Sequence, residues 1–375
     1  MTDQELLYTM ALTRLLPFSP TNQRTLLNEL GSATAVYENR HDLGSRMEHF
    51  SPRAAEVLAT MDKELSRCEQ ELAYAREHKI KILAIQDEAA YPSRLRQCED
   101  APLILYHLGN TDFNVHHVIS IVGTRRCTER GRDICNRLAA DLMHLRPDVL
   151  IISGLAYGID IAAHKAALAN SLPTVAVLAH GLDTIYPPLH RKTAIEMLQR
   201  GGLVTEYMSQ AKIDKVNFVQ RNRIVAGLAD ATVVVESAEH GGSLITAEMA
   251  GGYNREVLTF PGRPTDIASA GCNQLIRRNA AHLITSAEDL LADLGWETVC
   301  QPDGQEKIDF PETATPPSEE STILTTLKES DKDLSLSDLI VKTTLPMNRL
   351  TPFLLTLEMK GRIKKTAGNR YHFIH

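Results

Sequence analysis

The residue types best suited to binding chemistry gather in loops that follow short apolar runs. The first loop lies in IVGTRRCTERG, residues 121–131, and holds Gly123, Thr124 and Arg125. Gly123 lets the backbone turn tightly, and Thr124 and the free N–H groups of the following helix can bind an anion, while Arg125 adds a bidentate clamp. The pattern indicates an anion site, and a plain strand-to-helix turn is the alternative.

The second loop, in ISGLAYGIDIAAHKAAL, places Ser153, Gly154 and Gly158 between a buried strand and a helix. Gly158 permits close approach of the backbone to a ligand. The glycine spacing is not GxGxxG, and no acidic residue ends the next strand to hold a ribose hydroxyl. We therefore do not expect a nicotinamide dehydrogenase.

The third segment, KVNFVQRNRIVAG, interleaves cations with an aromatic ring. Lys215, Arg221 and Arg223, with Asn222 between the arginines, can neutralise phosphates while Phe218 stacks on a base. Single-stranded nucleic acid favours this arrangement. Two alternatives stay open, namely that Phe218 belongs to the core and that Arg223 is an internal salt-bridge partner.

The fourth loop, in ESAEHGGSLITAEMAGG, carries Gly241, Gly242 and Ser243 at the start of a helix, where successive backbone N–H groups can form a phosphate nest. Glu248 lies one helical turn further on. A Gly-Gly loop followed by a helical acid also resembles the phosphoribohydrolases, whose loop is PGGxGTxxE. The alternative function is therefore a nucleotide-cleaving enzyme that uses Glu248.

Other catalytic and metal-binding patterns are absent from the sequence, including a Walker loop, HExxH and GxSxG. We expect no metal, no cofactor and no catalytic residue. His164 is expected to be a packed histidine rather than a base, and the turn at 186–188 is expected to shape the rim of the site.

The elements around these loops predict an α/β fold. From Ser120 to about residue 260, β-branched apolar runs alternate with helical stretches, which indicates a doubly wound, mostly parallel sheet buried on both faces. Ligands bind at the carboxyl edge of such sheets. Residues 1–75 are expected to form a small helical domain, in which Pro20 starts and Gly31 ends the second helix, and 76–300 the extended α/β domain. An acidic, Pro-rich linker at 301–320 and a winged helix at 321–375 follow, the latter with a hairpin around AGN.

Charge and composition fit a folded nucleic-acid binder. The chain of 375 residues has a net charge of −7, yet Ser120 to Val225 holds 14 Lys or Arg against 9 Asp or Glu. No apolar run is long enough to span a membrane, the amino terminus lacks the features of a signal peptide, and the six cysteines form no CxxC pair. We expect a cytoplasmic protein with reduced thiols and no membrane association.

A set of motifs occurs in the order found in the DNA-processing protein A (DprA/Smf) family. They are IVGTR, SGLAYGID, LAHGLDTIYP, TEY, FVQRNRIVAGL, GGSLITAE and FPG. The resemblance is strongest over residues 85–295. It implies a Rossmann-like core, an amino-terminal domain similar to a sterile alpha motif (SAM-like) and a carboxyl-terminal winged helix.

The resemblance also implies a function without catalysis. Members bind single-stranded DNA, protect incoming DNA during natural transformation and load the RecA recombinase, and they act as homodimers. Carried over to this chain, the DNA contacts are Ser120 to Arg125, Ser153, Gly154, Gly158, Lys215, Phe218, Gly242 and Ser243. The sequence departs from the family pattern at Val219, where a proline is usual.

Overall fold

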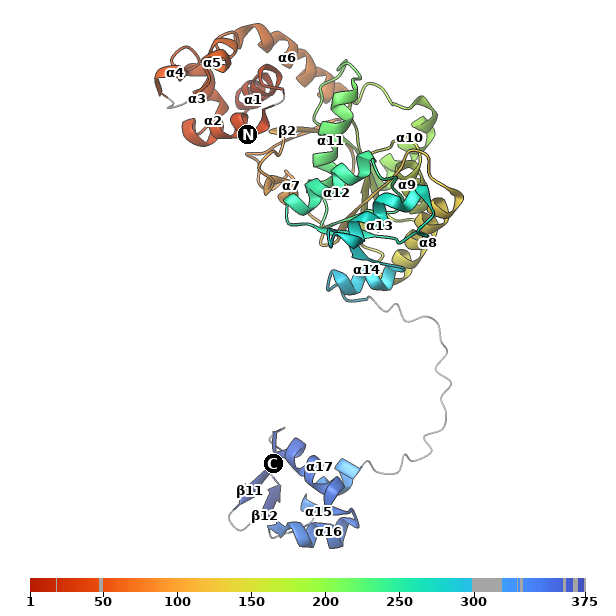
Figure 1. Cartoon of the computed structure of the whole chain (residues 1–375). Coiled ribbons are helices and arrows are strands. Elements are labelled where there is room, and N and C mark those ends of the chain that lie inside the picture. The colour runs from red at the N-terminus through yellow and green to blue at the C-terminus, as the bar shows by residue number, and fades with distance from the viewer. Residues whose placement is uncertain are drawn as a thin grey trace. The chain divides into compact units, whose positions relative to one another are not determined.

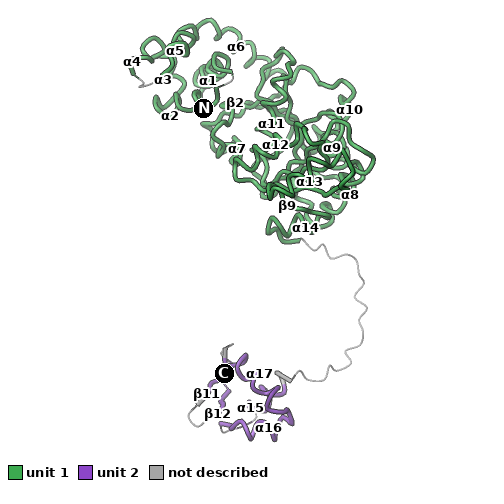
Figure 2. Tube along the Cα trace, viewed as in Figure 1, with its two compact units in different colours: residues 1–301 green, residues 302–375 purple. Residues whose placement is uncertain are grey.

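The structure is a computed structural model that describes residues 1–17, 19–46, 50–298, 319–328, 330, 333–359, 362–366 and 370–373. The chain divides into two compact units, Met1–Gln301 and Pro302–His375 (Figure 2). Most of the predicted linker at 301–320 lies outside the described residues, and helix α15 begins at Glu319. In the part of the chain that the structure describes, no helix has the length and apolar character needed to cross a membrane.

The first unit begins with helices. They are α1 (Asp3–Leu15), α2 (Pro20–Leu30), α3 (Ala33–Glu38), α4 (Leu43–Arg46), α5 (Pro52–Leu58) and α6 (Asp62–Glu77). Gly31 adopts a left-handed conformation with φ of 86° and ends α2, as its position in the sequence predicts. The buried faces of these helices share one hydrophobic core with residues of the first strands of the sheet, such as Leu105. The division of this unit at residues 75/76 stays a prediction.

A nine-stranded sheet follows, in the order β1-β2-β6-β5-β4-β3-β7-β8-β9. Its strand β2 lies next to the amino-terminal helix α1 (Figure 1). Strand β2 runs antiparallel to both of its neighbours, β1 and β6, and the remaining neighbours pair in parallel. The strands are β1 (Lys81–Ala84), β2 (Ile104–Gly109), β3 (Val118–Val122), β4 (Leu150–Ser153), β5 (Thr174–Val177), β6 (Gly201–Thr205), β7 (Ala231–Val234), β8 (Glu256–Thr259) and β9 (His282–Leu283). Strand order reverses at β3, because β4 lies on one side of it and β7 on the other.

Helices cover both faces of this sheet, so the doubly wound prediction is confirmed. They are α7 (Ser93–Arg96), α8 (Glu129–Leu145), α9 (Ile159–Ala169), α10 (Arg191–Arg200), α11 (Lys215–Gly227), α12 (Gly242–Gly252), α13 (Ala270–Arg277) and α14 (Ala287–Asp293), with 3-10 turns at Pro188–His190 and Ile267–Ser269. Alternate residues of β3 enter different cores: Ile119 and Ile121 pack with α8 and α9, whereas Val118 and Val122 join the core beneath α11 and α12.

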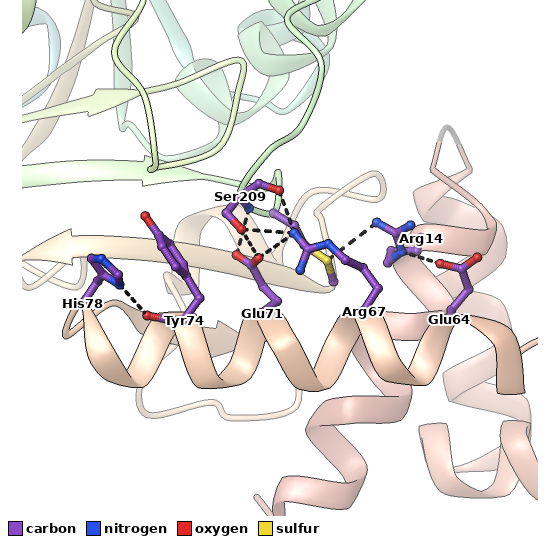
Figure 3. Close-up of polar contacts among 8 residues, drawn as sticks. Arg14, Glu64, Arg67, Glu71, Tyr74, His78 and Ser209 are labelled. Atoms are coloured by element: carbon purple, nitrogen blue, oxygen red, sulfur yellow. Dashed lines mark hydrogen bonds and ion pairs between the residues drawn. The ribbon is translucent and has the colours of Figure 1, made fainter.

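The helical segment is tied to the α/β core through α6. Glu71 and Arg67 on α6 bond to Ser209 in the loop after β6 (Figure 3). Arg14 lies close to the sulfur of Met208. These contacts connect the amino-terminal helices to the chain that leads into α11.

The second unit has the winged-helix pattern that the sequence predicts. Its elements are α15 (Glu319–Lys328), β10 (Leu334–Ser335), α16 (Leu336–Thr343), α17 (Met347–Met359), β11 (Ile363–Thr366) and β12 (Arg370–Phe373). Strands β11 and β12 pair antiparallel in a sheet of order β10-β12-β11. The predicted AGN turn at 367–369 lies outside the described residues. Leucines from α15, α16 and α17 form a separate core.

Candidate nucleic-acid interface

The carboxyl edge of the sheet holds a cavity of about 470 Å³ beside β3, where the strand order reverses. Loops after β3, β4 and β7 and the start of α11 line it. Most of the predicted site residues lie on its wall, namely Gly123, Thr124, Arg125, Gly154, Lys215, Phe218, Arg221, Asn222, Gly241, Gly242 and Ser243. Segments more than 100 residues apart thus meet at one site, because the parallel strands that precede them end at one edge.

The first loop is held by Glu236, the residue that follows the end of β7 by two positions. The N–H of Thr124 donates to the carbonyl oxygen of Glu236 at 2.7 Å. The buried Glu236 carboxylate accepts from the N–H of Thr128 at 2.8 Å and from its hydroxyl, at the start of α8. A carboxylate of the chain therefore holds the N-cap residue of this helix, and anion binding at the first loop stays a prediction.

Arg125 and two aromatic rings form one side of the cavity. The guanidinium carbon of Arg125 lies 5.5 Å from the centre of the Phe218 ring, and Tyr186 packs edge-on against that ring at 5.8 Å. Phe218 is half-buried and lies outside the described hydrophobic cores, so the alternative of a core phenylalanine is wrong. The exposed Arg125 leaves a cation and an aromatic surface next to each other, as binding of an unpaired nucleotide requires.

The floor of the cavity contains a buried cation. Arg221 is 3% exposed, and one of its terminal nitrogens donates to the carbonyl oxygens of Gly154 and Val177. A side chain on Gly154 would place its Cβ 2.2 Å from that nitrogen, so a larger residue there would displace the Arg221 guanidinium. Burial lowers the pKa of Arg221 and the nearby Asp160 opposes this, but arginine stays charged because its ordinary pKa is so high. Burial raises the pKa of Asp160 above its ordinary value, although the Arg221 guanidinium opposes this shift.

The fourth loop ends at α12, which begins at Gly242 after the N-cap Gly241. A helix leaves its first N–H groups without intrahelical partners, and here they lie at the cavity wall. Ser243 donates its hydroxyl hydrogen to the Ser237 hydroxyl, and Asn222 reaches the carbonyl oxygen of Gly242 at 3.5 Å. The predicted phosphate nest therefore lines the same cavity as Lys215 and Arg221 of α11.

Comparison with known proteins identifies the family of the chain that carries this site. The family profile described as "DNA recombination-mediator protein A" matches residues 81–295. The chain belongs to that family. The profile described as "DprA winged helix domain" matches residues 310–369.

Relatives and solved structures agree with this assignment. Protein Smf of Synechocystis sp. is 32% identical over 76% of this chain and 78% of its own length. DNA processing protein DprA of Streptococcus pneumoniae is 37% identical over 54% of this chain and 71% of its own length. Its solved structure covers 73% of this chain and 97% of that chain with a TM-score of 0.59 at 30% identity. A structure of DNA processing protein A from Helicobacter pylori, which has a single-stranded DNA binding mode, covers 57% of this chain and 95% of that chain (TM-score 0.51, 28% identity).

Four predicted contact residues lie outside the cavity wall. The hydroxyl groups of Ser120 and Ser153 are fully buried and bond to Thr232 and to the carbonyl oxygen of Ile121. Gly158 lies behind the first loop, where a Cβ would come within 2.1 Å of the Thr124 carbonyl oxygen. The side chains of Ser120 and Ser153 are therefore turned into the fold, and none of the three residues lines the cavity.

Arg223 is the fourth predicted contact residue that lies outside the cavity wall. Its side chain is 5% exposed, forms an ion pair with Glu206 and donates to the carbonyl oxygen of Asp100. The prediction of a DNA contact at Arg223 is therefore corrected, and the alternative of an internal salt bridge is confirmed.

Glu248, the acid of the alternative nucleotide-cleaving function, also lies outside the cavity wall. Glu248 is exposed on α12 and lines a separate groove with Leu244, Ala247 and Gly251. The acid at the cavity is Asp160, which sequence reasoning did not select. Among the residues that the structure describes, no group of His, Cys, Asp and Glu side chains is placed to hold a metal ion.

Sequence reasoning also did not select Val219, which lines the cavity. Val219 lies four residues after Lys215 and three before Asn222, so all three share one face of α11. The helical period could have identified it.

Proposed function

We propose that this chain binds single-stranded DNA in the cavity at the carboxyl edge of its sheet, without sequence readout and without catalysis. The observation that carries the proposal is the convergence of Arg125, Lys215 and the start of α12 with the ring of Phe218 in one cavity. Cations and backbone N–H groups would hold phosphates, and Phe218 would stack a base. Family membership and the single-stranded DNA binding mode of the Helicobacter pylori relative support this reading.

A salt titration of single-stranded DNA binding tests the proposal. Arg125→Ala and Lys215→Ala should each weaken binding by the same factor whatever the base sequence of the DNA. Each should also reduce the slope of log affinity against log salt by about 0.7, because each removes one phosphate contact on a single strand. Lys192→Ala is the matched control, since Lys192 is 90% exposed on α10 and lies outside the cavity wall. Wild-type affinity and slope in both cavity variants would contradict the assignment.

The proposal of binding without catalysis has its own test. Incubation with nucleoside monophosphates should release no free base. The position of Glu248 outside the cavity wall supports this expectation. Base release that Glu248→Gln abolishes would establish the enzymatic alternative instead.

We further propose, from membership of the family, that the chain protects incoming DNA and delivers it to the RecA recombinase during natural transformation, and that it acts as a homodimer. Light scattering should give twice the mass of the chain. RecA filaments should assemble faster on DNA that already carries this protein. A monomer with no effect on RecA would contradict both statements and leave DNA binding intact.

A further inference from the structure

Exposed apolar side chains stand at the mouth of the cavity. Tyr186 is 42%, Val216 51% and Val219 45% exposed. Tyr186 and Val219 line the cavity itself, and Val216 lies three residues before Val219 on the same face of α11. We call these three residues the apolar rim.

The apolar rim is continuous with the groups proposed to bind DNA. The Tyr186 ring contacts Phe218, and Lys215 directly precedes Val216 at the start of α11. Isolated exposed apolar residues need no explanation, whereas a group of them beside a binding site marks an interaction surface. The position of this group places its occupant next to any ligand that the cavity holds.

We propose that the apolar rim receives the bases of the nucleotides that flank the one held in the cavity. The inference rests on the proposed function. Phosphates held at Arg125 and Lys215 leave the neighbouring bases at the cavity mouth, where they would otherwise face water. Valine and tyrosine surfaces can cover a base face, and valine offers no hydrogen bond to a base edge, so the rim adds affinity for every sequence. A protein partner on the same surface is the competing occupant.

An abasic strand separates these occupants, because it keeps every phosphate and removes the bases. The variant is Val216→Ser with Val219→Ser, since both side chains are exposed and serine has a helix propensity close to that of valine. Ile195→Ser is the matched control, because Ile195 is 52% exposed on α10. Affinities of the full-length proteins are measured for an oligothymidylate and for an abasic strand of equal length.

We expect the double variant to bind oligothymidylate about tenfold more weakly than wild type, from the loss of apolar contact area. Its affinity for the abasic strand and both affinities of Ile195→Ser should stay at wild-type values. Equal losses on both strands, no loss on either, or a changed oligomeric state with unchanged DNA affinity would each overturn the inference. Failure of the wild-type protein to bind either strand would instead contradict the proposed function.

Discussion

The carboxylate of Glu71 on α6 accepts hydrogen bonds from the backbone N–H of Ser209, at 2.9 Å, and from its hydroxyl. Arg67 donates to the same carboxylate at 2.8 Å and to the Ser209 carbonyl oxygen at 2.7 Å. Figure 3 shows the two side chains converging on Ser209 from one face of α6. Six residues later the chain enters α11 at Lys215, so the amino-terminal helices hold the segment that positions a wall of the cavity.

Glu71→Ala should therefore reduce both stability and DNA affinity. Glu71 is 2% exposed, and its loss leaves the Ser209 N–H without its acceptor and removes one of the acceptors of Arg67, which costs about 1–3 kcal/mol. Urea unfolding measures this cost, and a binding titration measures the affinity. Asp3→Ala is the control, because its ion pair with Arg76 joins side chains that are 72% and 61% exposed and should contribute little. Equal effects of the two substitutions would contradict the positioning role.

Gly158 and Gly242, two of the predicted contact residues, should differ in how much stability they lose on substitution by alanine. Gly158 has φ of 79° and its Cβ would lie 2.1 Å from the Thr124 carbonyl oxygen, so Gly158→Ala should cost about 1–3 kcal/mol or more. A Cβ on Gly242 meets no atom within 4 Å, so Gly242→Ala should leave the unfolding free energy nearly unchanged. If a phosphate approaches the start of α12, Gly242→Ala should still weaken DNA binding. Full affinity in that variant would exclude a phosphate there.

Stability should fall in mild acid because of a buried histidine on α9. Nδ1 of His164 donates to the Thr174 hydroxyl, whereas Nε2 is buried without a partner, and burial lowers the pKa of His164 to about 3. The unfolded chain binds this proton below about pH 6.5 and the folded protein does not, so the contribution is lost as pH falls from that value. Burial likewise lowers the pKa of His107 to about 4.

Urea unfolding at pH 7.5 and 5.5 measures the effect. Each histidine should remove about 1.4 kcal/mol at the lower pH. His164→Gln should shrink the difference between the two pH values, whatever it does to stability at pH 7.5. An unchanged difference in that variant would contradict the role of His164.

The sequence predicts the loops of the site better than their side-chain orientations. Gly, Ser and Arg after apolar runs mark the carboxyl edge of a parallel sheet, and the chain topology then brings these loops together. Arg221 and Arg223 look equivalent in the sequence, yet one forms the cavity floor and the other an internal ion pair. Their partners decide this, and the partners of Arg221 are backbone carbonyl groups that carry no residue-type signal. The pairing of Glu236 with Thr128 spans 108 residues and is equally hidden.

Glu236 supplies a final prediction, because its buried carboxylate lies at the start of α8. Its carboxylate accepts from both the N–H and the hydroxyl of Thr128, and a Cβ on Gly131 would lie 2.5 Å from one of its oxygens. Glu236→Ala should cost about 1–3 kcal/mol, since it removes a buried acceptor and a charge that the helix dipole favours. Glu129→Gln, in the same first turn but exposed, is the control.

The vacated position should then behave as an anion site. Added sulfate should raise the unfolding free energy of Glu236→Ala more steeply than that of the wild type, because an ion that binds only the folded state stabilises it by mass action. The general stabilising effect of sulfate acts on both proteins and cancels in the comparison. Parallel responses would mean that the start of α8 attracts anions too weakly to be a site, and that Glu236 acts only through its bonds to Thr128.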